Sequence, residues 1–150
     1  MRPNTLHGNF WSSNEIGTTT FIFAQQSDIP QPLILVVEDN SDNLLLLSYA
    51  LETFGCNYLG ETDSRAALRL VKECQPNLIL LDILMPSLDG IGFLTHLRQD
   101  PSTQSIPVIA VTALVGVNER KRLLNAGFTD YLSKPYMLDE LEALIHRHLK

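Results

Sequence analysis

Short apolar runs alternate with longer amphipathic segments along most of this chain. The clearest run is 78–81, four apolar residues that lead directly into the carboxylate of Asp82 and then into a loop containing Pro86 and Gly90. A continuous apolar run of this length, bounded by loop residues, is typical of a strand buried on both faces of a parallel sheet. The other strands are predicted at 33–37, 57–61, 106–112 and 129–132. Helices are predicted at 43–54, 64–73, 90–98, 118–125 and 138–149.

Five successive strand–helix units predict an α/β domain with a doubly wound, five-stranded parallel sheet covered by helices on both faces. Turn chemistry supports the boundaries: Asp63 is placed to cap the second helix, and Gly55 and Gly127 are placed to end the helices before them. The proline-punctuated stretch 28–32 resembles a linker. We therefore expect an extension over residues 1–30 and one domain over residues 31–150.

Polar side chains that could bind a ligand or take part in a reaction lie where the predicted strands end. Glu38 and Asp39 follow the first strand, Asp82 ends the third, Thr112 ends the fourth and Lys134 follows the fifth. The carboxyl ends of parallel strands meet at one edge of a sheet, so we expect these groups to lie together. Clustered acids are costly unless a cation joins them or a proton is taken up, and oxygen ligands suit Mg²⁺. Asp82 could then act as a nucleophile towards a phosphoryl group.

In order and separation, these residues resemble the receiver domain of two-component response regulators over residues 32–150. The matching motifs are the acidic pair Glu38-Asp39, Asp82 followed by Met85-Pro86 and Asp89-Gly90, the strand end Val111-Thr112-Ala113, and the pair Lys134-Pro135. The resemblance implies a flavodoxin-like (βα)5 fold and a signalling protein rather than an enzyme.

The resemblance also implies the chemistry of the site. Asp82 would accept a phosphoryl group from a histidine kinase or phosphotransfer protein in a Mg²⁺-dependent reaction. Asp39, Asp82 and the backbone carbonyl of Leu84 would ligate Mg²⁺, and Glu38 would help through a water. Glu38 stands where the family more often has aspartate, which lengthens the acid without removing it.

Control of a partner-binding surface is a further implication of the resemblance. Thr112 and Tyr131 would form a switch pair in which the hydroxyl moves towards the phosphoryl group and the ring swings inward, while Lys134 pairs with a phosphoryl oxygen. The Lys134–Pro135 bond is usually cis in this family. Leu84 and Leu114 occupy positions that tune water access to the acyl phosphate, and both are apolar, so we hypothesise a long-lived phosphoaspartate.

The N-terminal segment carries a second resemblance, to the closing β-hairpin of a histidine-kinase ATP-binding domain. Residues 6–23 contain a glycine, an extended segment, a turn between Ser13 and Gly17 and then a Thr-Phe-x-Phe strand. We interpret residues up to about 26 as a remnant of a hybrid kinase without an ATP site; an adventitious tail is the alternative. The apolar residues of this segment favour a hairpin packed on the domain or paired between chains, which leaves a homodimer open.

Composition and spacing exclude several other classes. A net charge of -6 argues against a nucleic-acid surface, and no apolar run approaches the roughly 20 residues that span a bilayer. The isolated Cys56 and Cys74 indicate a reducing compartment, so we expect a cytoplasmic protein. A haloacid-dehalogenase phosphatase would need an acid where Leu84 stands, and a dinucleotide-binding enzyme would need glycines at 38–42. The remaining rival is a receiver-like interaction module that works without phosphorylation.

Overall fold

The computed structural model describes residues 10–13, 19–23, 31–85, 88–113 and 116–149, with side chains from residue 31 onward. Within these ranges the chain forms one seven-stranded sheet and five helices. The strands are β1 (Phe10–Ser13), β2 (Thr19–Phe23), β3 (Leu33–Val37), β4 (Asn57–Glu61), β5 (Leu78–Asp82), β6 (Val108–Thr112) and β7 (Asp130–Ser133). The helices are α1 (Ser41–Thr53), α2 (Ser64–Cys74), α3 (Gly90–Gln99), α4 (Val117–Ala126) and α5 (Leu138–His148).

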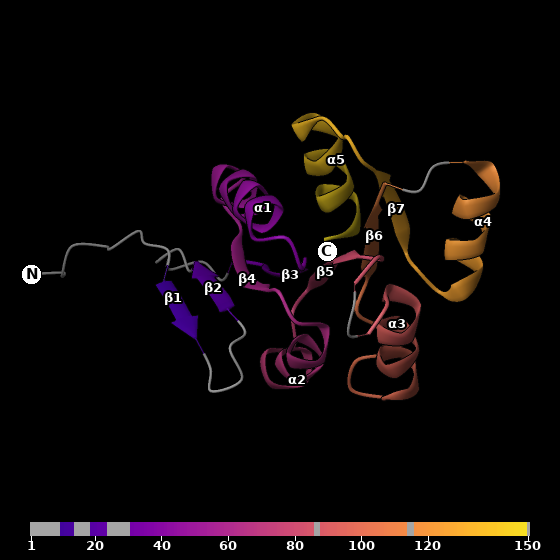
Figure 1. The fold of residues 1–150 in the computed structure, drawn as a ribbon, viewed down its shortest axis with the longest axis horizontal. Coiled ribbons are helices and arrows are strands. Elements are labelled where there is room, and N and C mark those ends of the chain that lie inside the picture. Colours follow the sequence, from indigo (N-terminus) through magenta and orange to yellow (C-terminus); the bar gives the residue numbers. More distant parts are fainter. Residues whose placement is uncertain (1–9, 14–18, 24–30, 86–87, 114–115, 150) are drawn as a thin grey trace, which may run out of the picture.

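The five strands from β3 to β7 are parallel and lie in the order β4-β3-β5-β6-β7. In Figure 1, α1 and α5 cover one face of this sheet, α2 and α3 cover the other, and α4 lies beside β7. This is the doubly wound arrangement expected from the sequence. The winding direction reverses between β3 and β5, and ligands of open α/β sheets bind outside the carboxyl ends of the strands at such a point.

Two apolar cores, one on each face, hold the sheet between its helices. Side chains of a strand alternate between faces, so Ile34 and Val36 enter the core under α1 and α5, whereas Leu35 and Val37 enter the core under α2 and α3. Burial on both faces explains why the sequences of β3, β5 and β6 are nearly continuous apolar runs.

The helix ends follow from local hydrogen-bond chemistry. Asn40, Asp63 and Asp89 cap α1, α2 and α3 by accepting from a backbone N–H three residues later, at 3.0, 2.9 and 2.8 Å. Gly55 and Gly127 follow α1 and α4 with φ of +77° and +112°, a conformation that glycine adopts without a Cβ penalty. The cap predicted at Asp63 and the helix ends predicted at both glycines are therefore confirmed.

The bounds of two predicted strands differ from those in the structure: β6 is shorter at its start, and β7 is shifted by one residue. The structure begins β6 at Val108 rather than at residue 106, because Pro107 has no N–H to give to a strand ladder. Strand β7 covers Asp130–Ser133 rather than 129–132. Thr129 precedes it; its N–H donates to the Val108 carbonyl at 2.8 Å, and its hydroxyl accepts from the Val108 N–H at 3.0 Å.

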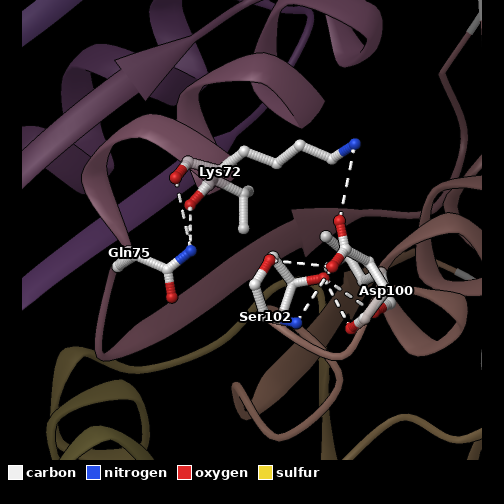
Figure 2. A network of polar contacts seen from close by, with 7 residues as sticks. Lys72, Gln75, Asp100 and Ser102 are labelled. Atoms are coloured by element: carbon white, nitrogen blue, oxygen red, sulfur yellow. Dashed lines mark hydrogen bonds and ion pairs between the residues drawn. The ribbon is translucent and has the colours of Figure 1, made fainter.

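Polar contacts tie the C-terminal end of α2 to the connection after α3 (Figure 2). Gln75 ends α2 with φ of +48°, and its side-chain amide donates to the carbonyls of Val71 and Lys72. The Lys72 ammonium lies 3.5 Å from Asp100, whose other oxygen accepts from the N–H and hydroxyl of Ser102 at 2.9 and 2.8 Å. These donors hold the pKa of Asp100 below its usual value. Exposed pairs of this kind contribute little stability, so the network fixes local geometry rather than the fold.

The hairpin expected near the N-terminus is present as β1 and β2, which pair antiparallel. It extends the expected five-stranded sheet to seven strands, because β2 also pairs antiparallel with β4 from Tyr58 to Glu61. The backbone of β4, which would otherwise be an edge, is thereby paired within the same chain.

None of the helices in the described part of the chain is both long and apolar enough to cross a membrane.

Candidate functional site

Three carboxylates meet at the carboxyl edge of the sheet, where its winding reverses. Glu38 and Asp39 directly follow β3, and Asp82 is the last residue of the neighbouring β5. One carboxylate oxygen from each lies within 4.8 Å of one from each of the others. Glu38 is buried, Asp82 is partly buried and Asp39 is exposed. The structure therefore brings together the three acids that the sequence placed at strand ends.

Glu38 is the electrostatically unusual member of this cluster. Its side chain is 2% exposed; Oε1 accepts from the Lys134 ammonium at 3.2 Å, whereas no described residue donates to the buried Oε2. Burial raises the pKa of Glu38 to about 7, and the neighbouring Asp82 adds to the rise, while Asn43 and Lys134 oppose it. A buried carboxylate oxygen without a hydrogen-bond donor is suited to a cation with oxygen ligands.

Lys134 reaches the acids from the end of β7. Its ammonium lies 3.2 Å from Glu38 and 3.9 Å from Asp82 Oδ2. The Lys134 N–H donates to the Thr112 carbonyl at 2.7 Å, and the bond from Lys134 to Pro135 is cis. Thr112 itself is fully buried at the end of β6. The backbone contact therefore joins the ends of β6 and β7 next to the acidic cluster.

The loop after Asp82 is shaped by close backbone approaches. The Leu84 N–H donates to Asp82 Oδ1 at 3.1 Å, and the Gly90 N–H donates to the Ile83 carbonyl at 2.9 Å. A Cβ on Gly90 would lie 2.7 Å from the Ile83 Cα, so no larger residue fits there without a backbone shift. Asp89 caps α3. The Asp89-Gly90 motif thus joins the loop after Asp82 closely to the start of α3.

Tyr131 and Thr112 lie on the adjacent strands β7 and β6. Tyr131 is partly buried and packs against the core under α2 and α3, and its backbone N–H donates to the Asp130 carboxylate at 2.8 Å. Leu84 follows the site with a side chain that is 57% exposed, whereas Leu114 lies outside the described residues.

Tyr136 also lies beside the site, although the sequence analysis did not single it out. It is partly buried against the core under α1 and α5, and burial together with the charge of Glu38 raises its pKa to about 12. With Lys134, Leu46 and Leu138 it lines a cavity of about 630 Å³ between α1 and the start of α5. Its position directly after Lys134-Pro135 was the available signal.

Comparison with known proteins identifies the family of this chain. The sequence model described as the response regulator receiver domain matches residues 34–146. Curated relatives include the transcriptional regulatory protein PrrA of Mycobacterium tuberculosis, with 38% identity over 122 residues, which are 81% of this chain and 52% of PrrA. The probable transcriptional regulator ycf27 of Porphyridium aerugineum is 37% identical over 78% of this chain and 48% of its own length. The chain thus spans about half the length of these relatives.

Solved structures give the same result. The receiver domain of the sensor histidine kinase PA1611 from Pseudomonas aeruginosa has a TM-score of 0.73 and 31% identity, covering 79% of this chain and 98% of that domain. It carries a magnesium ion coordinated in its active-site cleft. The chemotaxis protein CheY4 of Vibrio cholerae, at 22% identity and a TM-score of 0.75 over 80% of this chain and 100% of its own, shares the fold. This chain belongs to the family of response regulator receiver domains of two-component signalling systems.

Proposed function

We propose that this receiver domain takes a phosphoryl group on Asp82 from a histidine kinase or a histidine-containing phosphotransfer protein. The observation that carries the proposal is the convergence of Glu38, Asp39, Asp82 and Lys134 at one sheet edge. Phosphoryl transfer requires mainly positioning and charge neutralisation, and this set offers an acceptor, a lysine and a cation site.

The residues fit a magnesium ion. Asp39, Asp82 and the Leu84 carbonyl are the proposed ligands, with Glu38 acting through a water. Oxygen-only donors and the buried, unpartnered oxygen of Glu38 support this assignment. Bound there, the ion would neutralise charge that develops on the phosphoryl oxygens.

The chain's own groups have distinct tasks in this proposal. The N–H of Leu84 holds one oxygen of Asp82, and the other oxygen faces Lys134. As the carboxylate attacks phosphorus, the bond from phosphorus to the donor histidine nitrogen breaks. Lys134 then moves from the acids to a phosphoryl oxygen, and the Thr112 hydroxyl donates to another.

The output is a change of surface. Thr112 and Tyr131 form the proposed switch pair, whose rearrangement alters the face around α4 for a downstream protein. The exposed, apolar Leu84 beside Asp82 supports a slow attack by water, and hence a phosphoaspartate that outlasts seconds.

Domain organisation is also proposed on sequence grounds. We assign residues 31–150 to the receiver and residues 1–30 to an extension that resembles the end of a histidine-kinase ATP-binding domain. The phosphodonor would be a cytoplasmic histidine kinase or phosphotransfer protein. The second candidate is a receiver that binds partners without phosphorylation; the intact set of acids and lysine argues against it.

Intact-mass measurement after addition of acetyl phosphate tests the proposed function. We expect one added phosphoryl group with Mg²⁺, none with EDTA and none in Asp82→Asn. The matched control Asp139→Asn removes an exposed acid on α5 and should behave as the wild type. One equivalent of uptake by Asp82→Asn, or no uptake by the wild type, would move the assignment to another acid or to the phosphorylation-independent module.

A further inference from the structure

Glu61, the last residue of β4, is a buried acid that lies beside the three-acid cluster without belonging to it. Its side chain is 1% exposed, and it is not one of the three acids whose oxygens converge. Val37 at the end of β3 lies opposite Glu61, and the next residue, Glu38, donates its N–H to the Glu61 carbonyl at 3.1 Å. The hydrogen bonding between β3 and β4 therefore continues one residue beyond β3 and holds the backbone of Glu38.

The side chain of Glu61 holds the turn that follows β4. Its Oε1 accepts from the Asp63 N–H at 3.1 Å, and the Asp63 carboxylate in turn accepts from the Ala66 N–H at the start of α2. A buried carboxylate is costly unless hydrogen bonds and favourable charge compensate for its burial, and the N-terminal end of a helix supplies both. The position of Glu61 is thus fixed by the turn into α2 as well as by its bond to Glu38.

Strand β4 is intrinsically weak at the point where it holds Glu38. Gly60 precedes Glu61, and a glycine inside a strand has no side chain to pack and loses more conformational entropy on folding than other residues. A Cβ on Gly60 would lie 2.9 Å from Cδ1 of the fully buried Leu44 on α1, so a larger residue would crowd this contact. The end of β4 therefore depends strongly on its neighbouring strands.

Strand β2 is the neighbour of β4 on its outer side. Phe21 lies opposite Gly60 and Thr20 lies opposite Glu61, so the antiparallel pairing reaches the last residue of β4. On the inner side, the end of β3 pairs with the same two residues of β4. The end of β4 is thus enclosed between two strands, one of which leads directly into Glu38.

Glu38 needs this backbone contact because its side chain is held at few points. Its Oε1 accepts from the Lys134 ammonium at 3.2 Å, whereas no described residue donates to the buried Oε2. Groups that bind a cation must be held within about 0.5 Å of the productive geometry. A shift of the Glu61 carbonyl would move the backbone of Glu38, and with it the oxygen that is available to a cation.

We propose that Glu61 is a positioning residue for the cation site, and that β2, by pairing with Glu61, stabilises the geometry in which Glu38 serves a cation. The binding of a cation rests on the proposed function, whereas the contacts that connect β2, Glu61 and Glu38 do not. Coupling between two events is reciprocal. Pairing of β2 should therefore strengthen cation binding, and cation binding should strengthen the pairing of β2 by the same factor.

The Mg²⁺ affinity of the full chain tests the effect of β2 on the site. Isothermal titration without a phosphodonor should show an affinity that falls about fivefold in the double variant Phe21→Pro/Ile22→Pro, the lower end of the usual coupling range. Neighbouring residues of a strand direct their N–H groups to opposite sides, so one of the two prolines removes a donor to β4. Ile106→Val, in the core before β6, is the control for lowered stability and should leave the affinity unchanged. Unchanged affinity in the double variant would overturn the role of β2.

Substitution of Glu61 separates positioning from charge. Glu61→Ala removes the acceptor of the Asp63 N–H and should weaken Mg²⁺ binding by about fivefold. Glu61→Gln loses the charge but keeps an oxygen for that bond, so its affinity should stay within about twofold of the wild type. Equal weakening in the two variants would mean that Glu61 acts through its charge, and unchanged affinity in both would mean that it does not act on the site; either result overturns the positioning role. If the alanine variant does not fold, the glutamine variant and the β2 variant still decide.

Hydrogen–deuterium exchange tests the effect of the cation on β2, with a readout that needs no phosphoryl transfer. Saturating Mg²⁺ should slow exchange of residues 20–23 by about fivefold, the same factor as the change in affinity. Asp82→Asn removes a proposed ligand and should abolish the slowing. The end of α5, where His148 bonds to Asp130 at the start of β7, is the control segment and should change by less than about twofold. No slowing in β2, or equal slowing in β2 and at the end of α5, would overturn the coupling.

The same titrations distinguish a failure of this coupling from a failure of the proposed function. A wild-type chain that binds no Mg²⁺ would contradict the cation site, and the coupling would fall with it. Binding of equal strength in the wild type, the β2 variant and both Glu61 variants would overturn the coupling alone and leave the proposed function in place.

Discussion

At the scale of single residues, Glu38 and Asp39 show how neighbouring acids come to differ. Successive residues at a strand end point in opposite directions, so Glu38 is buried beside Lys134 while Asp39 remains exposed. Burial makes the charged form of Glu38 costly, and its pKa rises to about 7. This single carboxyl can therefore change its protonation near neutral pH.

Without divalent cations, we expect Glu38 to make the folded state less stable as pH rises. Its folded-state pKa, about 7, lies above its ordinary value of 4.5, so the folded chain holds the proton more tightly than the unfolded chain. The stability is fully present below pH 4.5 and is lost as pH rises through about 7. The loss is on the order of 3 kcal/mol. Urea unfolding in EDTA at pH 5 and pH 8, with Glu38→Gln as reference, measures it; an equal pH dependence in wild type and Glu38→Gln would contradict the assignment.

Cation binding should reverse this pH dependence. Mg²⁺ competes with the proton of Glu38, so its affinity should weaken as pH falls below about 7, and binding at pH 6.5 should release protons. Isothermal titration in two buffers of different ionisation enthalpy measures the release. Glu38→Gln should abolish the proton release even where some affinity remains. A buffer-independent heat for the wild type would count against the coupling.

Replacing Lys134 separates uptake from response. Lys134→Met removes the ammonium that faces both Glu38 and Asp82, but leaves the proposed acceptor and metal ligands in place. We expect the variant still to take up a phosphoryl group, at a changed rate. The change in hydrogen exchange of α4 that accompanies phosphorylation should be lost. Intact mass and hydrogen exchange on one sample distinguish the two effects, and a full α4 response in Lys134→Met would show that the lysine does not transmit it.

At the scale of elements, the start of α3 depends on a glycine for packing rather than for flexibility. Gly90 and Gly92 both lie in α3, where alanine would gain helix propensity. However, a Cβ on Gly90 would meet the Ile83 Cα at 2.7 Å, whereas a Cβ on Gly92 would meet side-chain atoms, a flexible Leu88 methyl at 2.9 Å and the Asp89 Oδ1 at 3.2 Å. The same substitution should therefore act differently two residues apart.

We expect Gly90→Ala to destabilise the domain by about 1–3 kcal/mol, the usual range for overpacking against a fixed neighbour. Gly92→Ala should cost less than about 1 kcal/mol because the Leu88 side chain can turn away. Chemical denaturation of both variants gives the difference. Equal effects would mean that the Ile83 backbone yields readily, and that the loop after Asp82 is not held by this contact.

At the scale of the whole molecule, the sequence was sufficient wherever a pattern is local. The strands at 33–37, 57–61 and 78–82 were predicted with the observed bounds, because each is a short run closed by turn or polar residues. The burial of Glu38 and the position of Tyr136 beside the site could not be predicted, since each depends on elements distant in the sequence. The hairpin was expected, but its pairing with β4 was not, because which strand pairs with a sheet edge depends on the tertiary fold rather than on local sequence.

The hairpin therefore offers a test of how the molecule is divided. The solved receiver of PA1611 matches 79% of this chain over 98% of its own length, so a complete domain of this family is smaller than this chain. Removal of residues 1–30 should leave a folded domain that still takes up phosphate. Its free energy of unfolding should be lower by about 1–3 kcal/mol, because the β4 backbone from Tyr58 to Glu61 loses its β2 partner. Circular dichroism, denaturation and intact mass of the truncated chain decide this. An unfolded product would make the hairpin part of the domain, whereas unchanged stability would mean that the pairing of β2 with β4 does not stabilise the receiver.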